Sequence, residues 1–323
     1  MSKPIVIWSN ARLPADAAAE LSAGARPHRL IIAAQLTGNL TAGPPDPQLS
    51  EATVALGQPD VKQVMELGHL AWIHLTSAGY ARYDRPDIRQ ALQARGARMT
   101  NSSSVFADPC AQHVLAFMLA DARQIPRCVT DQEHRSWQTI PIRQASRLLT
   151  GRTMLILGMG AIARRLMELL APFQPKLIVV RKSLRGDETV ETHAVSDLPA
   201  LLPRADHVVS ILPSGPETDG MFTSDLFSRM KAGAVFYNIG RGTTVDQNAL
   251  AAALNSNHLR AAYLDVTNPE PLPTDHPLWA APNCHLTPHT AGGHGEEFLY
   301  SVRHFLSNLK RFESGQPLVD RVM

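Results

Sequence analysis

The chain has 323 residues, which at roughly 150 residues per domain predicts two domains, each with a core of its own. Hydrophobic residues make up 44% and charged residues 19%, which excludes a disordered protein or a highly charged tail protein. Lysine and arginine number 31 against 29 for aspartate and glutamate, and the net charge is +2. This balance gives no electrostatic reason to expect a nucleic acid or a membrane as partner.

The three cysteines are widely spaced and form no Cys-x-x-Cys pair, which predicts reduced thiols rather than a disulfide framework or a zinc site. No apolar run approaches the length of about 18 residues that a transmembrane helix needs. The N-terminal segment MSKPIVIW lacks the architecture of a signal peptide. We therefore expect a soluble, cytoplasmic protein without a metal site.

Short apolar runs alternate with amphipathic segments along the whole chain. The runs are rich in Val, Ile, Leu and aromatic residues and are nearly continuous in apolar character, which is typical of parallel strands covered on both faces. In chain order the expected strands are residues 5–8, 30–33, 53–56, 72–76, 97–100, 154–157, 177–180, 208–212, 235–238, 262–265 and 285–287.

Helix start signals lie between these strands. Asp60, Asp87, Ser224 and Asp246 are residue types whose side chains accept hydrogen bonds from the free N–H groups of a first helical turn. The helices that they are expected to open are residues 61–67, 88–95, 225–231 and 247–256. Repeated alternation of strands and helices predicts a doubly wound α/β architecture.

Three further segments complete the expected secondary structure. Asp108 and Pro109 suit the N-cap and first position of a helix over residues 110–122. That helix is apolar on most sides, which is typical of a spine between domains or a subunit interface. A stripe of apolar residues predicts a helix over residues 296–312, and the Gly-, Pro- and Ser-rich residues 36–50 predict a loop.

The segment TMLILGMGAIARRL combines an apolar strand, a glycine-rich turn and a helix start. Gly158 permits the tight turn, Gly160 lets the backbone approach a pyrophosphate, and Ala163 is small enough for the helix to pack on the strand. The free amides of Ala161 and Ile162 can then bind the phosphates. A merely glycine-rich turn is the alternative, but the flanking strand and helix favour a dinucleotide site.

The residues after the next expected strand indicate which dinucleotide is bound. An acidic residue at this place would bind the ribose 2′-hydroxyl of NAD, but the chain has Arg181 and Lys182, followed by Arg185. A guanidinium can accept a 2′-phosphate, which a carboxylate would repel. The alternative is an ordinary solvated basic turn. We expect NADP(H) to be preferred, with NAD(H) possible.

Three later segments place polar side chains after expected strands, at the carboxyl edge of the sheet where α/β enzymes bind ligands. They contain Arg241 in NIGRG, Glu270 in DVTNPEP and His289 in TPHTAG. Such an arginine can bind and polarise a keto acid, and a histidine can protonate the developing alkoxide. A carboxylate can orient the imidazole and favour its protonated form. These residue types suit hydride transfer to a keto acid.

With these motifs the chain resembles the D-isomer-specific 2-hydroxyacid dehydrogenase family, which includes phosphoglycerate dehydrogenase and glyoxylate/hydroxypyruvate reductases. The resemblance covers nearly the whole chain. The family's catalytic arginine, glutamate and acid–base histidine match Arg241, Glu270 and His289, and its aspartate beside the nicotinamide matches Asp265. Beyond the glycine loop, the cofactor-binding positions that the resemblance implies are Arg181, Lys182, Leu212, Pro213, Thr218, Ile239, Asp265, His289 and Gly292.

The resemblance also implies a substrate loop upstream. The family's loop, whose backbone amides hold the substrate carboxylate, matches Ser77, Ala78 and Gly79. Next to it, Ala81 and Arg82 replace a more familiar polar pair. The identity of the substrate therefore cannot be carried over from better-known members.

The fold implied by the resemblance has a Rossmann nucleotide-binding domain inserted into a flavodoxin-like substrate domain. The expected substrate domain is residues 1–103 plus 291–323, and the expected nucleotide domain is residues 104–290. The resemblance implies a homodimer.

The favoured function is reduction of a small 2-keto acid to a D-2-hydroxy acid by NADPH. A dinucleotide-sensing binding protein, similar to the family's transcriptional corepressors, is the alternative from a different class. Formate oxidation is disfavoured, because that branch has a glutamine where this chain has Glu270.

Overall fold

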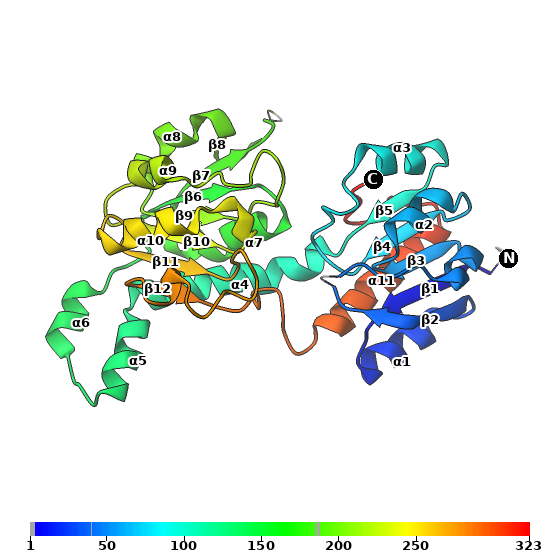
Figure 1. The fold of residues 1–323 in the computed structure, drawn as a ribbon, viewed down its shortest axis with the longest axis horizontal. Helices are drawn as coiled ribbons and strands as arrows, with labels where there is room; N and C mark the ends of the chain where they lie inside the picture. Colours follow the sequence, from blue (N-terminus) through cyan, green and yellow to red (C-terminus); the bar gives the residue numbers. More distant parts are fainter. Residues whose placement is uncertain (1–3, 40, 185, 187) are drawn as a thin grey trace. The chain divides into compact units, whose positions relative to one another are not determined.

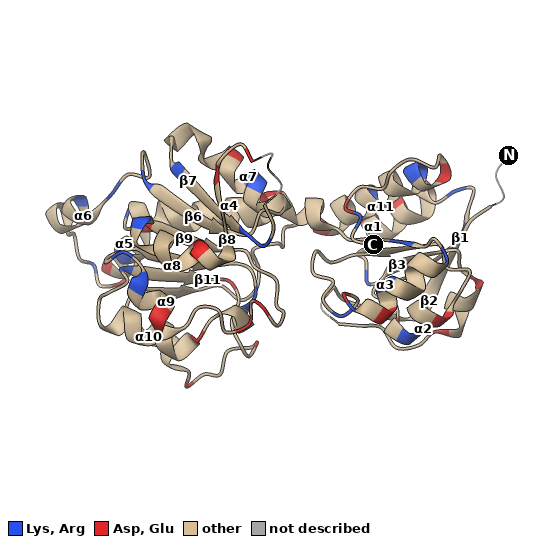
Figure 2. Cartoon of the chain, turned by 90° about the horizontal axis from the view of Figure 1, so that it is seen from above, with Lys and Arg blue, Asp and Glu red and all other residues tan. Residues whose placement is uncertain are grey.

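A computed structural model describes residues 4–39, 41–184, 186 and 188–323, so that Arg185 lies outside the described residues (Figure 1). The chain divides into two compact units. Unit 1 consists of residues 1–106 and 293–323, and unit 2 of residues 107–292. Acidic and basic residues are interspersed on the helices and loops of each unit (Figure 2).

Unit 1 is built on a five-stranded parallel sheet in the order β2-β1-β3-β4-β5, which is the flavodoxin-like order. Its strands are β1 Val6–Ala11, β2 Arg29–Thr37, β3 Val54–Gly57, β4 Trp72–Leu75 and β5 Arg98–Thr100. Separate apolar clusters cover the two faces of this sheet. The helices are α1 Ala15–Gly24, α2 Val61–Glu66, α3 Pro86–Ala94, α11 Glu297–Glu313 and the first turn of α4 Ser103–Ala122.

Unit 2 is built on a seven-stranded parallel sheet in the order β12-β11-β10-β9-β6-β7-β8. When the strands of this unit are numbered in chain order, their spatial order from β8 is 3-2-1-4-5-6-7, which is the Rossmann order with one more strand. Its strands are β6 Thr153–Leu157, β7 Lys176–Arg181, β8 Glu191–Ala194, β9 His207–Ser210, β10 Val235–Asn238, β11 Ala261–Leu264 and β12 Cys284–Leu286. The two doubly wound sheets confirm the predicted fold class.

The helices of unit 2 include most of α4. The others are α5 Ile125–Glu133, α6 Thr139–Ala145, α7 Ala161–Leu170, α8 Leu198–Leu201, α9 Ser224–Arg229 and α10 Gln247–Asn255. Short 3₁₀ helices in the two units are η1 Pro47–Glu51, η2 Ala171–Phe173, η3 Val195–Asp197, η4 Leu202–Arg204, η5 Gly242–Thr244 and η6 Pro277–Trp279.

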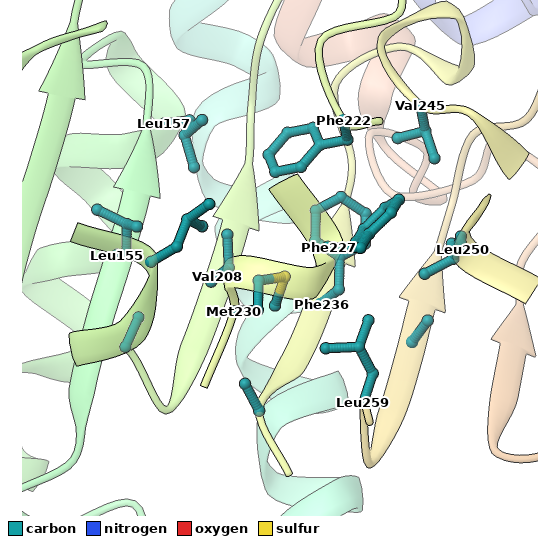
Figure 3. Packing of buried hydrophobic residues seen from close by; sticks show 14 of the residues in the cluster. Leu155, Leu157, Val208, Phe222, Phe227, Met230, Phe236, Val245, Leu250 and Leu259 are labelled. Carbon is teal, nitrogen blue, oxygen red and sulfur yellow. The ribbon is translucent and has the colours of Figure 1, made fainter. Parts of the chain in front are cut away.

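The core of unit 2 is apolar. Phe236 on β10 contacts both Phe222 and Phe227, with ring centroids 4.7 and 5.3 Å apart, and Leu250 and Leu259 belong to the same buried cluster (Figure 3). Aromatic rings in offset or edge contact gain free energy beyond the burial of their area. This cluster supports the strand ends that carry the polar residues described below.

Every predicted strand overlaps an observed one, but β8 was not predicted. It is an edge strand whose sequence ETHA contains no apolar run, and none of its residues is fully buried. Helix α1 is absent from the predictions too, because its N-cap is Pro14, which offers no side-chain acceptor. Within the segment predicted as a loop, β2 extends to Thr37 and η1 forms from Pro47.

The predicted helix starts are partly confirmed. Asp60 accepts a hydrogen bond from Gln63 N, and Asp246 accepts from two N–H groups of α10. In contrast, α3 begins with Arg85 as its N-cap, so Asp87 lies inside the first turn. Ser224 is likewise the first residue of α9, not its cap.

The predicted start of the long helix at residue 110 is wrong. Helix α4 begins at Ser103, which places Pro109 inside it. Two side chains cap its first turn: Asn101 Oδ1 accepts a hydrogen bond from Ser103 N at 3.2 Å, and the carboxylate of the distant Asp320 accepts one from Ser104 N at 2.8 Å. Nor is the helix buried all round in the described chain, because Leu119 is 37% exposed.

Candidate active site

The glycine loop joins β6 to α7. Gly158 has φ 104°, and a Cβ there would lie 3.3 Å from the carbonyl oxygen of Ile211, so the turn favours glycine. Gly160 is the N-cap of α7, so the N–H groups of Ala161 and Ile162 have no acceptor inside the helix. Ala163 is fully buried at the packing face of α7. The loop therefore offers free donors at a helix N-terminus, as a pyrophosphate requires.

Basic residues follow the neighbouring strand β7. Arg181 ends this strand, and its guanidinium lies 3.7 Å from the carboxylate of Glu188. Lys182 forms a 2.6 Å ion pair with Glu217, which belongs to the loop after β9. The Arg181 side chain is only 17% exposed, so it lies against the protein rather than in a freely solvated turn.

The loop after β9 folds back on itself near the glycine loop. Leu212 and Pro213 follow the strand, and Thr218 Oγ1 donates a hydrogen bond to the Pro213 carbonyl at 2.6 Å. A second bond joins Thr218 N to the Gly215 carbonyl. These bonds fix the shape of a loop whose backbone lies beside the glycine loop, as the close approach of Ile211 to Gly158 shows.

Arg241 lies after β10, between two glycines at which backbone segments meet closely. A Cβ on Gly240 would overlap the backbone of Leu212, and a Cβ on Gly242 would overlap the backbone of Thr267. Ile239, just before them, is buried. The Arg241 side chain donates a 2.6 Å hydrogen bond to the Gly240 carbonyl and remains partly exposed. The close backbone contacts fix the position of this loop and so of the guanidinium.

Glu270 and His289 form a direct pair. Glu270 Oε2 lies 2.7 Å from His289 Nδ1, and Glu270 Oε1 accepts a hydrogen bond from Thr267 N at 3.1 Å. His289 has φ 53°, and its own N–H donates to the Asp265 carbonyl. With Nδ1 engaged by the carboxylate, the other ring nitrogen is left for proton transfer. Both side chains are about one-third exposed, which leaves them accessible to a ligand.

Asp265, at the end of β11, organises the segment that carries the histidine. Its buried carboxylate accepts hydrogen bonds from Thr287 Oγ1 at 2.6 Å, Thr290 N at 2.8 Å and Ala291 N at 3.0 Å. Gly292 directly follows these donors. In this structure the Asp265 carboxylate is therefore engaged by the protein's own loop, a role that the sequence analysis did not foresee.

Thr287 and His113 are polar neighbours that the sequence analysis did not include in the site. His113 Nε2 lies 3.1 Å from Thr287 Oγ1 and 3.7 Å from Asp265 Oδ1. Burial lowers the pKa of His113, and the nearby Asp265 carboxylate opposes that shift. Thr287 could have been found as the first residue of TPHTAG. His113, on α4, had no sequence signal linking it to that segment.

Cys110 lies close to these groups, but its thiol is unreactive. Burial and the negative charge of Asp265 raise the pKa of its thiol to about 12, although the Arg241 charge opposes this. The thiolate is the reactive form of cysteine, so Cys110 is not a nucleophile at neutral pH. All three cysteines are free.

The loop that matches the family's substrate loop follows β4 in unit 1. Ser77 is buried, Ala78 half-buried and Gly79 exposed. Gln58 Nε2 donates to the hydroxyls of Thr76 and Ser77, which ties the loop to the end of β3. Unit 2 thus brings together Glu270, His289 and Asp265, while unit 1 holds the substrate loop as a separate, well-bonded element.

The described residues offer neither a metal centre nor a membrane-spanning helix. No group of three or more His, Cys, Asp or Glu side chains among them could hold a metal ion. In the same part of the chain, no helix is long and apolar enough to cross a membrane.

Comparisons with known proteins place these features in a family. Residues 115–291 match the sequence model described as "D-isomer specific 2-hydroxyacid dehydrogenase, NAD binding domain". The chain is 33% identical over 238 residues to an "Uncharacterized protein in proB 3'region" of Corynebacterium melassecola, covering 73% of this chain and 77% of that protein. It is 34% identical over 201 residues to the human "Glyoxylate reductase/hydroxypyruvate reductase", covering 61% of each protein.

Solved structures match over almost the whole chain. A D-isomer specific 2-hydroxyacid dehydrogenase family protein from Aeromonas salmonicida is 28% identical, with a TM-score of 0.75 and coverage of 99% of both chains. A D-isomer specific 2-hydroxyacid dehydrogenase from Xanthobacter autotrophicus Py2, solved with NADPH and MES, is 26% identical, with a TM-score of 0.81. The match covers 100% of this chain and 98% of that one.

Proposed function

Because the chain belongs to the D-isomer specific 2-hydroxyacid dehydrogenase family of NAD(P)-dependent oxidoreductases, we propose that it reduces a small 2-keto acid to the D-2-hydroxy acid. The substrate is of the glyoxylate or hydroxypyruvate type, as in the name of the human relative. The observation that carries the proposal is the 2.7 Å contact between Glu270 and His289 at the carboxyl edge of the unit 2 sheet. A paired carboxylate and imidazole at this edge suit proton transfer to a substrate oxygen.

In the proposed reaction His289 is the general acid. Its Nε2–H donates a proton to the keto oxygen as the carbonyl carbon is reduced, and Glu270 keeps the ring oriented through Nδ1. Arg241 binds the substrate carboxylate and stabilises the charge that develops on the keto oxygen. In the reverse direction the same imidazole accepts the proton. A bound nicotinamide dinucleotide supplies the hydride.

The residues around the glycine loop fit such a dinucleotide. Gly158 and Gly160 let the pyrophosphate approach the backbone, and the first N–H groups of α7 hold it. Leu212, Pro213, Thr218 and Ile239 follow β9 and β10 and would line the nicotinamide half, together with Gly292. For Asp265 we propose an indirect role, since its carboxylate already holds the segment that carries His289.

We further propose that NADP(H) is preferred over NAD(H). Arg181 and Lys182 end the strand next to the glycine loop, where the 2′ position of the ribose is recognised. Both basic groups are now paired with carboxylates, and a 2′-phosphate can replace these acceptors. The complex of the Xanthobacter protein with NADPH supports this preference.

A panel of small 2-keto acids assayed with NADPH and with NADH tests both proposals. We expect turnover of glyoxylate or hydroxypyruvate and a lower KM for NADPH than for NADH. Arg181→Asp is expected to reverse that order, because a carboxylate repels the 2′-phosphate. Lys176→Asp, the same charge change at the other end of β7, is the control that leaves the order intact. Absence of turnover would refute the reaction, and equal KM values would refute the cofactor preference.

We propose a homodimer assembled through α5 and α6. These two helices contain no buried residue, and short helices in water need an apolar face packed against something. Apolar side chains on and beside them are exposed, namely Ile125, Val129, Trp137, Ile140 and Leu148. Sedimentation of the wild type and of Trp137→Glu would test this, since a monomeric wild type would refute it. The cytoplasmic location remains a prediction.

A further inference from the structure

The substrate loop of unit 1 has an uneven pattern of backbone hydrogen bonds. Its three successive carbonyls are all engaged: Ser77 O accepts from Ser102 N at 3.1 Å, Ala78 O from Asn101 Nδ2 at 2.6 Å, and Gly79 O from Ser77 Oγ at 2.6 Å. In contrast, the N–H groups of Ala78 and Gly79 donate to no other described residue. Backbone N–H groups left without an acceptor are rare unless water or a ligand supplies one.

The bonded carbonyls determine where the free N–H groups point. In a planar trans peptide the C=O and the N–H project in opposite directions. Neither the Ser77–Ala78 nor the Ala78–Gly79 bond is among the cis peptides of the described chain. Fixing Ser77 O therefore aims the N–H of Ala78, and fixing Ala78 O aims the N–H of Gly79. The first carbonyl is held by a backbone group, but the second is held by one side chain, that of Asn101.

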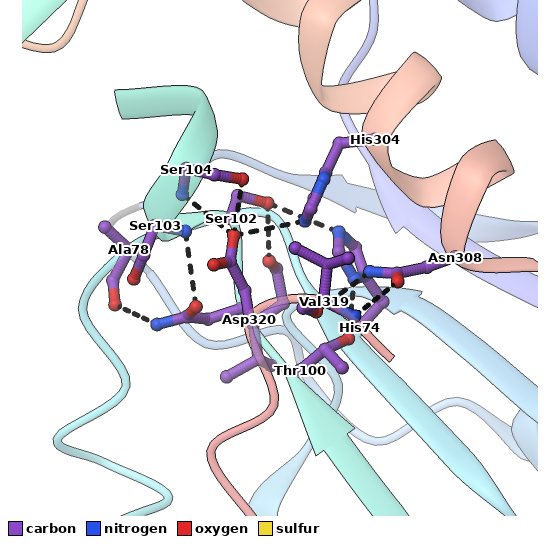
Figure 4. Close-up of polar contacts among 12 residues, drawn as sticks. His74, Ala78, Thr100, Ser102, Ser103, Ser104, His304, Asn308, Val319 and Asp320 are labelled. Atoms are coloured by element: carbon purple, nitrogen blue, oxygen red, sulfur yellow. Dashed lines mark hydrogen bonds and ion pairs between the residues drawn. The ribbon is translucent and has the colours of Figure 1, made fainter. Parts of the chain in front are cut away.

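The amide nitrogen, the amide oxygen and the backbone N–H of Asn101 are all hydrogen-bonded. Its side chain is nearly fully buried, its Oδ1 accepts from Ser103 N at 3.2 Å, and its own N–H donates to the Asp320 carbonyl at 3.0 Å. The Asp320 carboxylate in turn accepts from the N–H and the hydroxyl of Ser104 (Figure 4). Because Oδ1 faces an N–H donor, the amide nitrogen must face the Ala78 carbonyl. The C-terminal tail thus fixes the asparagine, and the asparagine fixes the loop.

We propose that Asn101 is a positioning residue for the substrate carboxylate, which it serves by aiming the Gly79 N–H, and that Asp320 holds Asn101 in place. This inference rests on the proposed keto-acid reduction and names a residue for which neither motif nor resemblance assigned a role. Two successive backbone N–H groups without an acceptor can form the kind of concave backbone site that binds a carboxylate. The asparagine itself touches no substrate, so its effect is on the binding of the substrate and not on the chemical step.

The test replaces Asn101 by serine, a neutral side chain too short to reach the Ala78 carbonyl. Glyoxylate turnover gives KM and kcat, and calorimetric titration of oxalate into the protein with NADPH gives a dissociation constant that does not depend on turnover. We expect the KM for glyoxylate and the Kd for oxalate to rise about tenfold, which corresponds to the loss of one hydrogen bond. The kcat should stay within about twofold, and the KM for NADPH should not change.

Asn308→Ser is the matched control. Asn308 is also a buried asparagine of unit 1, and it bonds the N–H and C=O of Val319 in the same C-terminal tail, but it has no contact with the loop (Figure 4). Its loss should lower the melting temperature, but the KM for glyoxylate should rise much less than in Asn101→Ser, because the bonds of Asn101 to Ala78 and Ser103 remain. Equal increases in KM for the two variants would overturn the proposal, because a general loosening of unit 1 would then explain both.

The remaining outcomes also decide the question. Unchanged KM and Kd in Asn101→Ser would refute the positioning role while leaving the proposed reaction intact. If the wild type reduces no keto acid, the proposed function fails, and the oxalate Kd still compares the two variants. Should Asn101→Ser not fold, Asn101→Asp retains the acceptor for Ser103 N and the native volume. It lacks the donor to Ala78 O, so the Kd for oxalate should still rise.

Discussion

Unit 2 has three phenylalanines in mutual contact at its centre, whereas unit 1 has a buried polar set beneath its substrate loop. Most buried polar side chains of the described chain lie in unit 1, although it is the smaller unit. Thr100 Oγ1 there contacts Trp72 Nε1 at 2.9 Å and His74 Nδ1 at 2.7 Å, and Ser102 Oγ lies 3.3 Å from His74 Nε2.

The two cores differ in polarity because the two sheet edges expose different kinds of group to a ligand. Unit 2 presents side chains, such as Glu270 and His289, on loops whose strand ends are supported by an apolar core, and a single buried carboxylate, that of Asp265, holds the segment that carries His289. The substrate loop of unit 1 presents backbone N–H groups. Their direction is set by the preceding carbonyls, which must be hydrogen-bonded to residues packed against the loop. Buried polar groups are costly unless every one has a partner, so a site of this kind needs a connected polar network. Substitutions in the apolar core of unit 2 and in the polar network of unit 1 should therefore affect stability and KM differently.

The largest expected effect is chemical and belongs to unit 2. His289→Ala removes the proposed proton donor, and kcat for keto-acid reduction should fall about a thousandfold, within the range of general acid catalysis. The KM for NADPH should change much less than kcat. His193→Ala, on the edge strand β8, removes another histidine of the same unit and should leave kcat as it was. Comparable kcat in His289→Ala and wild type would remove His289 from the mechanism.

The next effect concerns the apolar core. Phe236→Ala removes a fully buried ring that contacts Phe222 and Phe227, and the free energy of unfolding should fall by about 3–5 kcal/mol. Urea unfolding followed by circular dichroism measures it. Below the transition the KM for glyoxylate should match that of the wild type. A large increase in KM would show that the core does more than support the strand ends.

A smaller loss is expected in the polar network of unit 1. Thr100→Val keeps the shape of the side chain but removes the hydroxyl that contacts Trp72 and His74. Leaving those buried ring nitrogens without a partner should cost about 1–3 kcal/mol of unfolding free energy. Since Thr100 is adjacent to Asn101, the KM for glyoxylate should rise as well. Loss of stability with an unchanged KM would mean that the network and the loop are independent.

The last prediction concerns a dependence of stability on pH that both units share, and at neutral pH its effect is close to zero. Burial lowers the pKa of His74 and of His207 to about 3. The folded protein keeps both rings neutral, while the unfolded chain takes up protons below about pH 6.5. Stability is therefore complete above that pH and falls toward pH 3, by up to about 1.4 kcal/mol per pH unit for each histidine.

Unfolding in urea at pH 7.5, 6.5 and 5.5 measures this slope. His207→Gln keeps a hydrogen-bonding partner for the Tyr237 hydroxyl but cannot titrate, so the slope should decrease by about half. The same slope in the variant and the wild type would show that folding does not lower the pKa of His207.

The sequence carried the information for buried, repetitive features. Parallel strands covered on both faces are continuous apolar runs, so β6 and β10 were found with nearly their observed limits. Features that depend on a distant segment were not found. The start of α4 at Ser103 depends in part on Asp320, which lies more than 200 residues away, and no local pattern encodes that contact. The edge strand β8 lacks an apolar signal because none of its residues is fully buried.

The candidate site shows the same division. His289 and Glu270 were named from short motifs, and the structure brings them into contact. Asp265 was named for a contact with the cofactor, but its carboxylate is bonded to the segment that carries the histidine, which only the folded loop reveals. No motif assigned a role to Asn101, since the role that we propose depends on peptide orientation and not on residue type.

The glycines on either side of Arg241 have a practical consequence for directed evolution. Gly240 and Gly242 lie where any side chain would overlap a neighbouring backbone segment. Libraries that randomise the whole loop would lose most of their members to misfolding at these two codons. A library aimed at substrate range should keep both glycine codons and vary Ala81 and Arg82, while Gly242→Ala serves as the inactive reference that sets the background of the screen.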